Sequence, residues 1–381
     1  MITGKESCEE ELQKKMETSI LKDMVKPLLD WYDLHARSLP WRENPLPYYV
    51  WVSEIMLQQT RVEAVKPFFQ RFIERLPDIK ALAECPTEQL LKLWEGLGYY
   101  NRVRNMQKAA AAVMERHGGK LPADHGALLR LPGIGSYTAG AIASISFGIP
   151  VPAVDGNVLR VTGRLCENEG DIGKQSVRRE VEALLQNVIP VSAPGKFNQA
   201  LMDLGAMVCL PGGAPKCREC PLEKLCQARQ HGREREFPVK APKKPKREEK
   251  HTVLVIRDGK KTVLRRRPGR GLLAGLYEFP NVPGHLGQAE ALEAVKGFGL
   301  SPVRITPLED AKHIFSHVEW QMKGWMVLVE ELEGEGAQGM FFVEPARTRR
   351  EFPIPSAFAA YASALSIKIG QEGIRNEGET A

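Results

Sequence analysis

The sequence predicts a mainly α-helical N-terminal region over residues 1–230, followed by a smaller α+β domain. Two observations support this division. Apolar residues recur at helical spacing through the first region, whereas short β-branched runs typical of strands appear only after residue 251. Between the two patterns, residues 231–250 are rich in Pro and Lys and nearly devoid of apolar side chains, which predicts a solvated linker. A chain of 381 residues is long enough for two domains with separate cores.

The helices of the first region are expected where apolar side chains repeat every three or four positions. This pattern is typical of an amphipathic helix that buries one face. Gly and Pro separate the helical segments from one another. The pattern occurs at residues 20–29 and in the segments VWVSEIMLQQTRVEAVKPFFQRFI (50–73), TEQLLKLWEGL (87–97), NMQKAAAAVMERH (105–117), SVRREVEALLQNVI (176–189) and FNQALMDLGAMV (197–208).

The second domain, residues 251–368, is expected to combine strands with a helix. Asp258-Gly259 predicts a tight hairpin turn between its first two strands. The polar residues 369–381 predict a disordered tail. The expected elements are strands at 252–256, 262–264 and 325–332, and a helix at 289–296.

The composition favours a polyanionic partner and disfavours a membrane or secreted protein. The formal net charge is +6 and the isoelectric point is near 8.8. No apolar run approaches the roughly 20 residues that a bilayer requires, and the first fifteen residues are too charged for a secretory signal. We therefore expect a cytoplasmic protein that works on nucleic acid in a compartment where thiols stay reduced.

Clustered cysteines predict a metal site. Four of the seven cysteines fall within one short segment that contains a Cys-x-x-Cys pair. Such spacing lets four thiolates reach a single centre, which makes four unpaired thiols the weaker interpretation. The spacing alone fits structural zinc and an iron–sulfur cluster equally well. The four candidate ligands are Cys209, Cys217, Cys220 and Cys226.

The segment LPGIGSYTAGA (131–141) predicts a hairpin between two helices. Gly133 and Gly135 allow the main chain to approach a ligand closely. The helix that follows begins with free N–H groups, which suit a phosphate. An ordinary helix-turn-helix corner is the alternative interpretation of the two glycines alone.

Two carboxylates are candidate catalytic groups. Glu54 shares a helical face with Val50, Trp51 and Leu57, and apolar surroundings raise the pKa of a carboxyl until it can hold a proton near neutrality. Asp155 precedes a predicted helix, whose N–H groups would keep it ionised and able to stabilise positive charge on a sugar. A partly exposed helix Glu and an ordinary helix N-cap are the alternatives.

Taken together, these motifs resemble the MutY family of adenine DNA glycosylases over nearly the full chain. The resemblance implies a helix-hairpin-helix glycosylase region of two helical lobes with an iron–sulfur cluster loop, followed by a Nudix-like domain. The matching segments are LPWR (39–42), VWVSEIMLQQT (50–60), LWEGLGYYNRVRN (93–105), LPGIGSYTAGA (131–141), VDGNVLRV (154–161), FNQALMDLGAMVC (197–209), RRPGRGLLAGLYEFP (266–280) and HIFSH (313–317).

The resemblance implies that the protein excises adenine mispaired with 8-oxoguanine or guanine in double-stranded DNA. Glu54 would protonate the base at N7, and Asp155 would stabilise the cationic sugar. Tyr137 and Asn157 would hydrogen-bond around these two carboxylates. The adenine pocket would be lined by Trp41, Arg42 and Gln199.

A tyrosine at position 137 predicts a monofunctional glycosylase that leaves an abasic site. Related bifunctional enzymes carry a lysine there, which attacks the sugar and forms an imine. A phenol cannot form an imine. We also expect the protein to act as a monomer.

Further residues are implied to contact DNA or the base opposite the adenine. Gln59 and Tyr99 would wedge into the base stack, which offsets the cost of extruding a nucleotide. A loop in the second domain would sense 8-oxoguanine through Phe315, Ser316 and His317. Without this context, a surface Gln, a core Tyr and ordinary loop residues are the alternatives. The implied DNA contacts are Leu57, Gln59, Thr60, Tyr99, Leu131, Gly133 and Gly135.

The resemblance also implies a [4Fe-4S] cluster on the four cysteines. In the family, six residues usually separate the first two ligands, whereas LPGGAPK places seven between Cys209 and Cys217. The longer loop can still close on a cluster, but its contact with DNA can differ.

Three other classes of protein share part of these features. A bifunctional pyrimidine glycosylase shares the first region, but Tyr137 and the second domain disfavour it. A nucleotide-pool hydrolase explains only the second domain, and no Arg-Glu-x-x-Glu-Glu run follows Gly275 to supply metal ligands. A non-catalytic iron–sulfur DNA-binding module would not need Glu54 among apolar neighbours.

Overall fold

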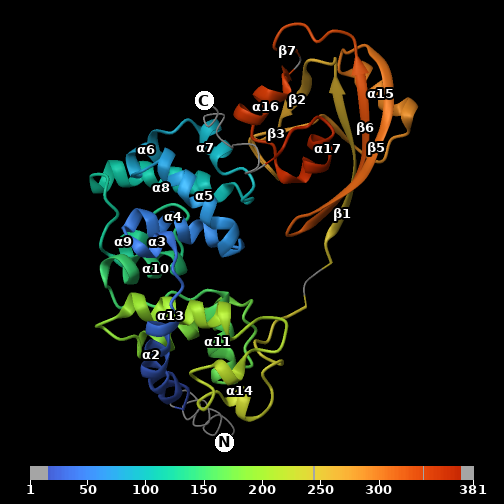
Figure 1. Ribbon diagram of the computed structural model, residues 1–381. Coiled ribbons are helices and arrows are strands. Elements are labelled where there is room, and N and C mark those ends of the chain that lie inside the picture. Colours follow the sequence, from blue (N-terminus) through green and yellow to red (C-terminus); the bar gives the residue numbers. More distant parts are fainter. Residues whose placement is uncertain (1–15, 243–244, 338, 370–381) are drawn as a thin grey trace, which may run out of the picture. The chain divides into compact units, whose positions relative to one another are not determined.

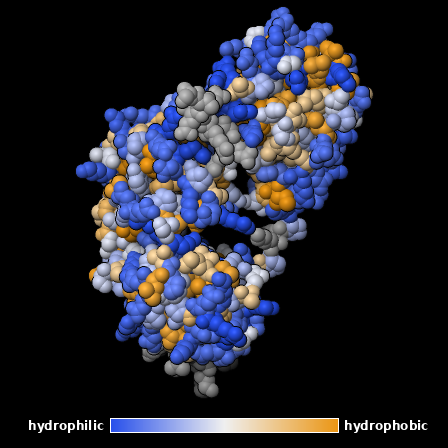
Figure 2. Space-filling model, viewed as in Figure 1, coloured by the Kyte–Doolittle hydropathy of each residue, from blue (hydrophilic) through white to orange (hydrophobic). Residues whose placement is uncertain are grey.

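The computed structural model describes residues 16–242, 245–337 and 339–369, and it divides into two compact units (Figure 1). Unit 1 consists of Met1–Ala83 and Asn105–Pro242, and unit 2 consists of Glu84–Arg104 and Lys243–Ala381. Hydrophilic residues cover most of the face of each unit that Figure 2 shows, and the large apolar side chains are mostly buried. Among the described helices, none is both long and apolar enough to cross a membrane.

Unit 1 is built from helices, as the sequence predicts. Residues 16–23 are helical. The later elements are α2 (Val25–His35), α3 (Pro40–Glu43), α4 (Pro47–Leu57), α5 (Val62–Arg75), α6 (Ile79–Glu84), α8 (Asn101–His117), α9 (His125–Leu129), α10 (Ser136–Phe147), α11 (Gly156–Leu165), α12 (Gln175–Gln186), α13 (Pro194–Met207), a 3₁₀ turn (Cys217–Glu219) and α14 (Gln227–Gln230).

Helix α10 is the central element of unit 1, because it packs against both α4 and α13. Its sequence SYTAGAIASISF is composed largely of small residues, which allow neighbouring backbones to approach closely. At Gly140 a Cβ atom would lie only 2.3 Å from the carbonyl oxygen of Pro152, so any side chain there would push these segments apart. Figure 1 shows α3–α5 on one side of α10 and α13, α11 and α2 on the other. The two sides form two helical lobes, as expected.

Unit 2 contains a curved mixed sheet. Its strands follow the order β5-β6-β1-β2-β8-β7, with β3 paired to β2 and β4 paired to β1. Strand β1 runs parallel to β6, whereas the other pairs are antiparallel. The elements are α7 (Thr87–Leu93), β1 (Arg247–Arg257), β2 (Thr262–Arg266), β3 (Tyr277–Glu278), β4 (Asn281–Pro283), α15 (Gln288–Gly297), β5 (Pro302–Ile314), β6 (Val318–Val329), β7 (Gly336–Ala337), β8 (Met340–Val343), α16 (Pro345–Glu351), a 3₁₀ turn (Ser356–Phe358) and α17 (Ala359–Ser363).

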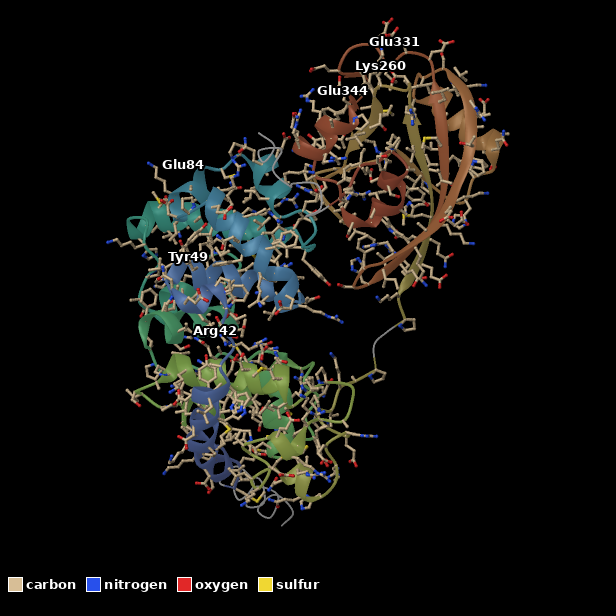
Figure 3. All side chains as sticks on the ribbon, in the orientation of Figure 1. Arg42, Tyr49, Glu84, Lys260, Glu331 and Glu344 are labelled. Atoms are coloured by element: carbon tan, nitrogen blue, oxygen red, sulfur yellow. The ribbon has the colours of Figure 1, made fainter. Side chains whose placement is uncertain are left out.

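The predicted hairpin and helix of the second domain are confirmed, but two strands differ from expectation. Asp258 Oδ1 accepts hydrogen bonds from the amides of Lys260 and Lys261 in the turn between β1 and β2. Strand β6 begins seven residues before the predicted start at Trp325. Strand β5 was not predicted, because it lies at the sheet edge, contains two prolines and exposes many of its residues. Figure 3 shows Lys260, Glu331 and Glu344 at one end of the sheet.

Residues 84–104 belong to unit 2, although the helical pattern assigned them to the first region. Backbone groups of the C-terminal segment explain this grouping. Glu95 accepts a hydrogen bond of 2.8 Å from the amide of Ile354, and Lys92 Nζ donates one of 3.2 Å to the carbonyl of Phe352. Helical periodicity reports a buried face but does not report which later segment covers it.

The expected linker, residues 231–250, is ordered against unit 1 at its start and becomes a strand at its end. Phe237 is only 2% exposed, and its carbonyl accepts a hydrogen bond of 3.0 Å from Arg164 Nε. The carbonyl of Val239 accepts another from the amide of Ile172. Strand β1 already begins at Arg247. One buried aromatic side chain thus anchors a segment whose average composition is polar. The predicted disordered tail falls almost entirely on residues 370–381, outside the described residues.

Candidate active site

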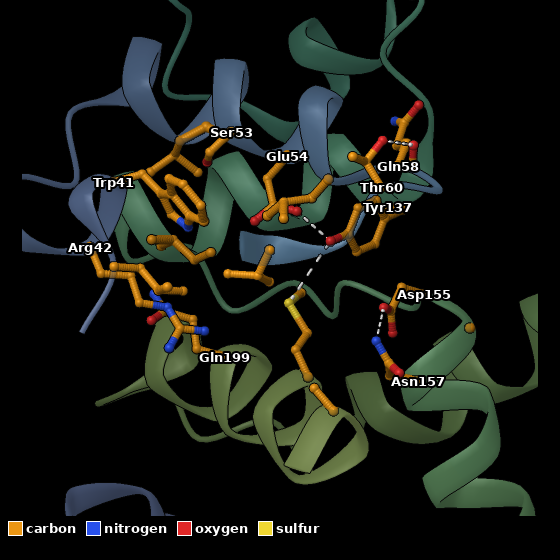
Figure 4. Close-up of a pocket in the computed structure, with 18 of the residues that line it drawn as sticks. Trp41, Arg42, Ser53, Glu54, Gln58, Thr60, Tyr137, Asp155, Asn157 and Gln199 are labelled. Atoms are coloured by element: carbon orange, nitrogen blue, oxygen red, sulfur yellow. Dashed lines mark hydrogen bonds between the residues drawn. The ribbon is translucent and has the colours of Figure 1, made fainter. Parts of the chain in front are cut away.

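A cavity of about 490 Å³ lies in unit 1 between the two helical lobes. Both candidate carboxylates, Glu54 and Asp155, line it (Figure 4). The remaining expected pocket residues, Trp41, Arg42, Tyr137, Asn157 and Gln199, line it as well. The structure therefore brings together side chains from α3, α4, the start of α10, the start of α11 and α13.

Glu54 is a buried carboxyl with a strongly raised pKa. It lies on α4 with 5% of its surface exposed. Burial raises its pKa to about 7, and the negative charge of Asp155 adds to this effect, whereas the hydrogen bond from Tyr137 and the charge of Arg42 oppose it. The carboxyl is therefore poised to give and take a proton near neutral pH, as the sequence pattern predicts.

Tyr137 links α10 to Glu54. Its hydroxyl donates to Glu54 Oε2 and lies 3.9 Å from Met202 Sδ (Figure 4). Burial, followed by the charges of Glu54 and Asp155, raises the pKa of Tyr137 well above its ordinary value. The side chain therefore remains a neutral phenol that can donate a hydrogen bond.

Asp155 is the N-cap of α11 and also lines the cavity, so its capping role does not remove it from the site. Its Oδ1 accepts a 2.8 Å hydrogen bond from the amide of Val158, and its Oδ2 accepts one of 2.8 Å from Asn157 Nδ2. Burial raises the pKa of Asp155, against the lowering effect of these donors. The donors hold the carboxylate in place and favour its charged form.

Arg160 supports this arrangement from behind and was not predicted from the sequence. Its guanidinium donates to Asn157 Oδ1 at 2.8 Å, to the carbonyl of Gly205 at 2.7 Å and to the carbonyl of Cys209 at 2.7 Å. The absence of a side chain at Gly205 is needed here, because a Cβ atom would lie 2.6 Å from Asn157 Cβ. Arg160 thus connects the Asp155–Asn157 pair to Cys209, the first of the four clustered cysteines.

A buried aspartate, Asp203, positions Arg42 at the other end of the cavity. Asp203 is fully buried and pairs with Arg42 at 2.7 Å and with Arg37 at 2.5 Å. The hydrogen bonds and charges of these arginines lower the pKa of Asp203, against the opposing effect of its burial. Gln199 is held by a 2.6 Å hydrogen bond from Tyr32. A charged residue within the apolar helical segment 197–208 was the available signal for Asp203.

The two-glycine hairpin forms as predicted and joins α9 to α10. Leu131 is buried at its start. Gly133 has φ of 74°, and a Cβ atom there would lie 2.6 Å from Asn105 Cβ, so no other residue fits. Gly135 is the N-cap of α10 and faces open space, with no side chain to cap the first N–H groups of the helix. These groups remain available to an anionic ligand.

The two expected wedge residues share an unusual backbone conformation. Gln59 has φ of 61° and Tyr99 has φ of 47°, which places both in the left-handed region that non-glycine residues rarely adopt. Leu57, Gln59 and Thr60 line the cavity of unit 1. Tyr99 belongs to unit 2, where 49% of it is exposed and its hydroxyl lies 3.1 Å from Ser316 Oγ.

The segment Phe315–Val318 forms the tight turn between β5 and β6, with the amide of Phe315 bonded to the carbonyl of Val318. The ring of Phe315 packs against Trp320 with ring centres 4.9 Å apart, and Trp320 Nε1 donates to Glu249 Oε2 at 2.8 Å. Lys246 Nζ donates to the carbonyl of Phe315. The turn is therefore held from three sides, while Ser316 and His317 are exposed.

The four clustered cysteines line one small cavity of about 30 Å³ in unit 1. Cys209 Sγ accepts a hydrogen bond of 3.2 Å from Arg164, which also donates to the carbonyl of Leu210. Within the described part of the chain, no three His, Cys, Asp or Glu side chains are gathered closely enough to hold a metal ion. The donor set of four thiols around one cavity nevertheless fits a group bound through sulfur.

Comparison with known proteins shows the family. The model of the HhH-GPD superfamily of base excision DNA repair proteins matches residues 52–187, and a NUDIX domain model matches residues 251–364. The human protein named adenine DNA glycosylase is 35% identical over 91% of this chain and 74% of its own length. The chain belongs to the adenine DNA glycosylase family. The protein of that name from Buchnera aphidicola subsp. Acyrthosiphon pisum is 36% identical over 66% of this chain and 72% of its own length.

Family membership confirms the expected fold class and makes the protein a DNA glycosylase, which is a hydrolase of base excision repair. A solved structure described as a thermostable thymine-DNA glycosylase supports the helical part of the fold. It is 28% identical, has a TM-score of 0.50 and covers 56% of this chain and 98% of its own. The adenine DNA glycosylase fold thus places Glu54 and Asp155 on one cavity, which is the geometry that the two-carboxylate hypothesis required.

Proposed function

We propose that this glycosylase removes adenine opposite 8-oxoguanine or guanine by extruding the nucleotide into the unit 1 cavity and hydrolysing its N-glycosidic bond. The observation that carries the proposal is the pair of carboxyl groups on that cavity. Glu54 is a buried acid with a pKa of about 7, and Asp155 is held by two hydrogen-bond donors. A cavity of about 490 Å³ is large enough for a nucleobase and part of its sugar.

The chemical step requires the two carboxyl groups in different roles. Glu54 protonates adenine at N7, which turns a poor leaving group into a better one. Positive charge then develops on the sugar, and the carboxylate of Asp155 stabilises it. Asn157 and the amide of Val158 hold that carboxylate in place. The ionised Glu54 then takes a proton from the water that completes hydrolysis.

Adenine binding is assigned to the opposite end of the cavity. Trp41 is buried and packs against Phe69, so its position is fixed. Arg42 and Gln199 supply polar groups, and their partners Asp203 and Tyr32 fix their orientation. Specific polar groups within a mostly apolar pocket are the usual means of selecting one base.

The same site supports a monofunctional reaction. Tyr137 stands where an imine-forming lysine would be needed, and its hydroxyl is bonded to Glu54. Among the described residues that line the cavity there is no lysine. An amine nucleophile is therefore missing from the site, and the product is an intact strand with an abasic site.

Recognition of the opposite base is assigned to residues outside helices and strands. Gln59 and Tyr99, which both have left-handed backbones, would enter the base stack. Ser316 and His317 would bond to the edge of 8-oxoguanine, presented by the turn that Phe315 anchors. The hairpin at Leu131, Gly133 and Gly135 would grip the DNA backbone through the first amides of α10.

A [4Fe-4S] cluster is the proposed cofactor. Cys209, Cys217, Cys220 and Cys226 would hold it, because thiolates are the ligands of such clusters and these four line one cavity. When bound, the cluster would cross-link the loop and hold it in a fixed shape. Arg164 would donate a hydrogen bond to one of the ligand sulfurs.

Excision from defined duplexes tests this function. Purified protein is incubated with duplexes that carry adenine opposite 8-oxoguanine, guanine or thymine, and free base and strand cleavage are measured separately. We expect free adenine from the first two duplexes and no strand break before alkali. Glu54→Gln should abolish release while retaining duplex binding. Release by the Glu54→Gln variant, or a β-elimination product trapped by borohydride in the unmodified protein, would contradict the proposal.

A further inference from the structure

A second cleft of about 780 Å³ adjoins the active-site cavity in unit 1. The two share Leu57, Gln59 and the segment Asp155–Asn157. The remaining wall includes Pro211–Ala214 of the cysteine loop and residues from the segment Arg235–Lys240. Neither family model covers that last segment, because one match ends at residue 187 and the other begins at residue 251.

The segment Arg235–Lys240 is held against the rest of unit 1 at two points, Phe237 and Val239. The ring of Phe237 is buried and the guanidinium of Arg233 lies over it, while the carbonyl of Phe237 accepts a hydrogen bond from Arg164, which also donates to Cys209 Sγ. Val239 is bonded through its carbonyl to the amide of Ile172. The side chains of Arg235 and Lys240 are therefore presented by an anchored backbone, which reduces the conformational entropy lost when they bind a ligand.

The charges that line this cleft favour an anion. Four of its lining residues are positively charged and only one, Asp155, is negatively charged. The guanidinium groups of Arg160 and Arg164 already donate hydrogen bonds to acceptors within the protein. Arg235 and Lys240 are exposed, and neither forms a salt bridge with any residue that the structure describes. The head groups of Arg235 and Lys240 are therefore exposed in the cleft beside Asp155, and a phosphate would compete there with Asp171, whose carboxylate interacts with the charge of Lys240 from outside the cleft lining.

The main chain of the cysteine loop, which lines the same cleft, is open to close approach. A Cβ atom at Gly212 or Gly213 would meet nothing within 4 Å, so this part of the cysteine loop leaves space for an extended polymer. A nucleotide extruded into the cavity remains attached to its strand through phosphates on both sides. At least one of these must leave through space that adjoins Asp155 and the sugar.

We propose that this cleft binds the DNA backbone beside the extruded nucleotide, with Arg235 and Lys240 each neutralising one phosphate. The proposal rests on the proposed function in taking a flipped nucleotide as the occupant of the neighbouring cavity. It assigns DNA binding to a segment that composition alone marks as a linker.

The salt dependence of binding tests the two contacts. Affinity for a duplex with adenine opposite 8-oxoguanine is measured in the Glu54→Gln background, in which adenine should remain bonded to its sugar. Each phosphate contact contributes about 0.9 to the slope of log affinity against log salt. Arg235→Ala with Lys240→Ala should therefore lower the slope by about 1.8. Between 50 and 200 mM salt, the variant should lose about 12-fold less affinity than its parent.

Two control variants separate charge from folding. Lys22→Ala with Lys26→Ala removes the same charge from exposed positions that line neither cleft nor cavity, and it should leave the slope unchanged. Arg235→Lys with Lys240→Arg keeps the charge and should keep the slope of the parent. An unchanged slope in the Arg235/Lys240 alanine variant, or an equal fall in the Lys22/Lys26 variant, would overturn the proposal.

Single neutral methylphosphonates placed along the adenine strand locate the contacts. Neutralising one or two phosphates that flank the adenosine should lower the affinity of the parent. The same neutral phosphates should not lower the affinity of the Arg235/Lys240 alanine variant any further, because the side chains that bind them are already absent. If the two losses of affinity added at every phosphate position, the assignment would be contradicted. If the unmodified chain released no adenine, the proposed function would fail, while the binding measurements would still decide on the cleft.

Discussion

Replacement of Tyr137 by Phe should move the alkaline limit of excision to higher pH. The Tyr137 hydroxyl donates to Glu54, which favours the charged carboxylate and lowers its pKa from the value that burial alone would set. A hydrogen bond to a charged group contributes about 1.5–3 kcal/mol. At 1.36 kcal/mol for each pKa unit, its loss raises the pKa of Glu54 by about one to two units.

The direction of the effect follows from the proposed role of Glu54 as an acid. The active form carries the proton, so excision should fall about tenfold for each pH unit above a pKa of about 7 in the unmodified protein. In Tyr137→Phe the same fall should begin about one to two units higher. The maximal rate should be lower as well, because the carboxyl loses a partner that orients it.

The assay is the excision rate at subsaturating enzyme, measured from pH 5 to 10, because this quantity reports the free enzyme. Tyr32→Phe is the matched control, since it removes a buried phenol hydroxyl that bonds to Gln199 and not to Glu54. Its alkaline limit should stay near pH 7. If the alkaline limit of excision in Tyr137→Phe were unchanged or moved to lower pH, the coupling between Tyr137 and Glu54 would be refuted.

Three further outcomes are expected. Because the pKa of Glu54 in the folded protein is about 7, above its ordinary 4.5, the folded state loses stability as pH rises between these values. The free energy of unfolding, compared with that of Glu54→Gln, should therefore fall by about 3 kcal/mol from pH 4.5 to pH 8. Urea titration at each pH measures this difference. Asp203→Asn should lower the free energy of unfolding by about 3 kcal/mol, because it leaves two partly buried arginines without their carboxylate; a loss under about 0.5 kcal/mol would show that this cluster is not coupled to the fold. Ser316→Ala with His317→Ala should reduce the preference for adenine opposite 8-oxoguanine over adenine opposite guanine while single-turnover rates on each duplex stay measurable, and an unchanged preference would remove these residues from recognition.

The burial of Glu54 and the N-cap position of Asp155 could be predicted from the sequence, because each depends on local surroundings. Glu54 lies among apolar residues of its own helix, and Asp155 directly precedes a helix that it caps. Two supporting residues could not be found this way. Asp203 on α13 pairs with Arg42, which lies 161 positions away on α3, and Arg160 on α11 donates to the carbonyls of Gly205 and Cys209, 45 and 49 positions away. Only the packing of distant elements brings these partners together.

The domain organisation shows a similar limit. Averaged composition correctly separated helical from mixed α+β sequence, but it could not show that Phe237 is buried or that residues 84–104 group with the C-terminal unit. Both outcomes depend on a few long-range contacts. Strand β5 was missed for a different reason, because an edge strand with Pro302 and Pro307 lacks the alternation on which strand prediction depends.

The most direct test of the account is the pKa of Glu54 itself. Carbon-13 NMR of protein labelled at the glutamate carboxyl carbons, with the Glu54 signal assigned by its loss in Glu54→Gln, follows the titration of this one group. We predict a midpoint of about 7. A midpoint near the ordinary value of 4.5 would show that Glu54 is ionised at neutral pH, and it would contradict the assignment of this residue as the acid that protonates the base.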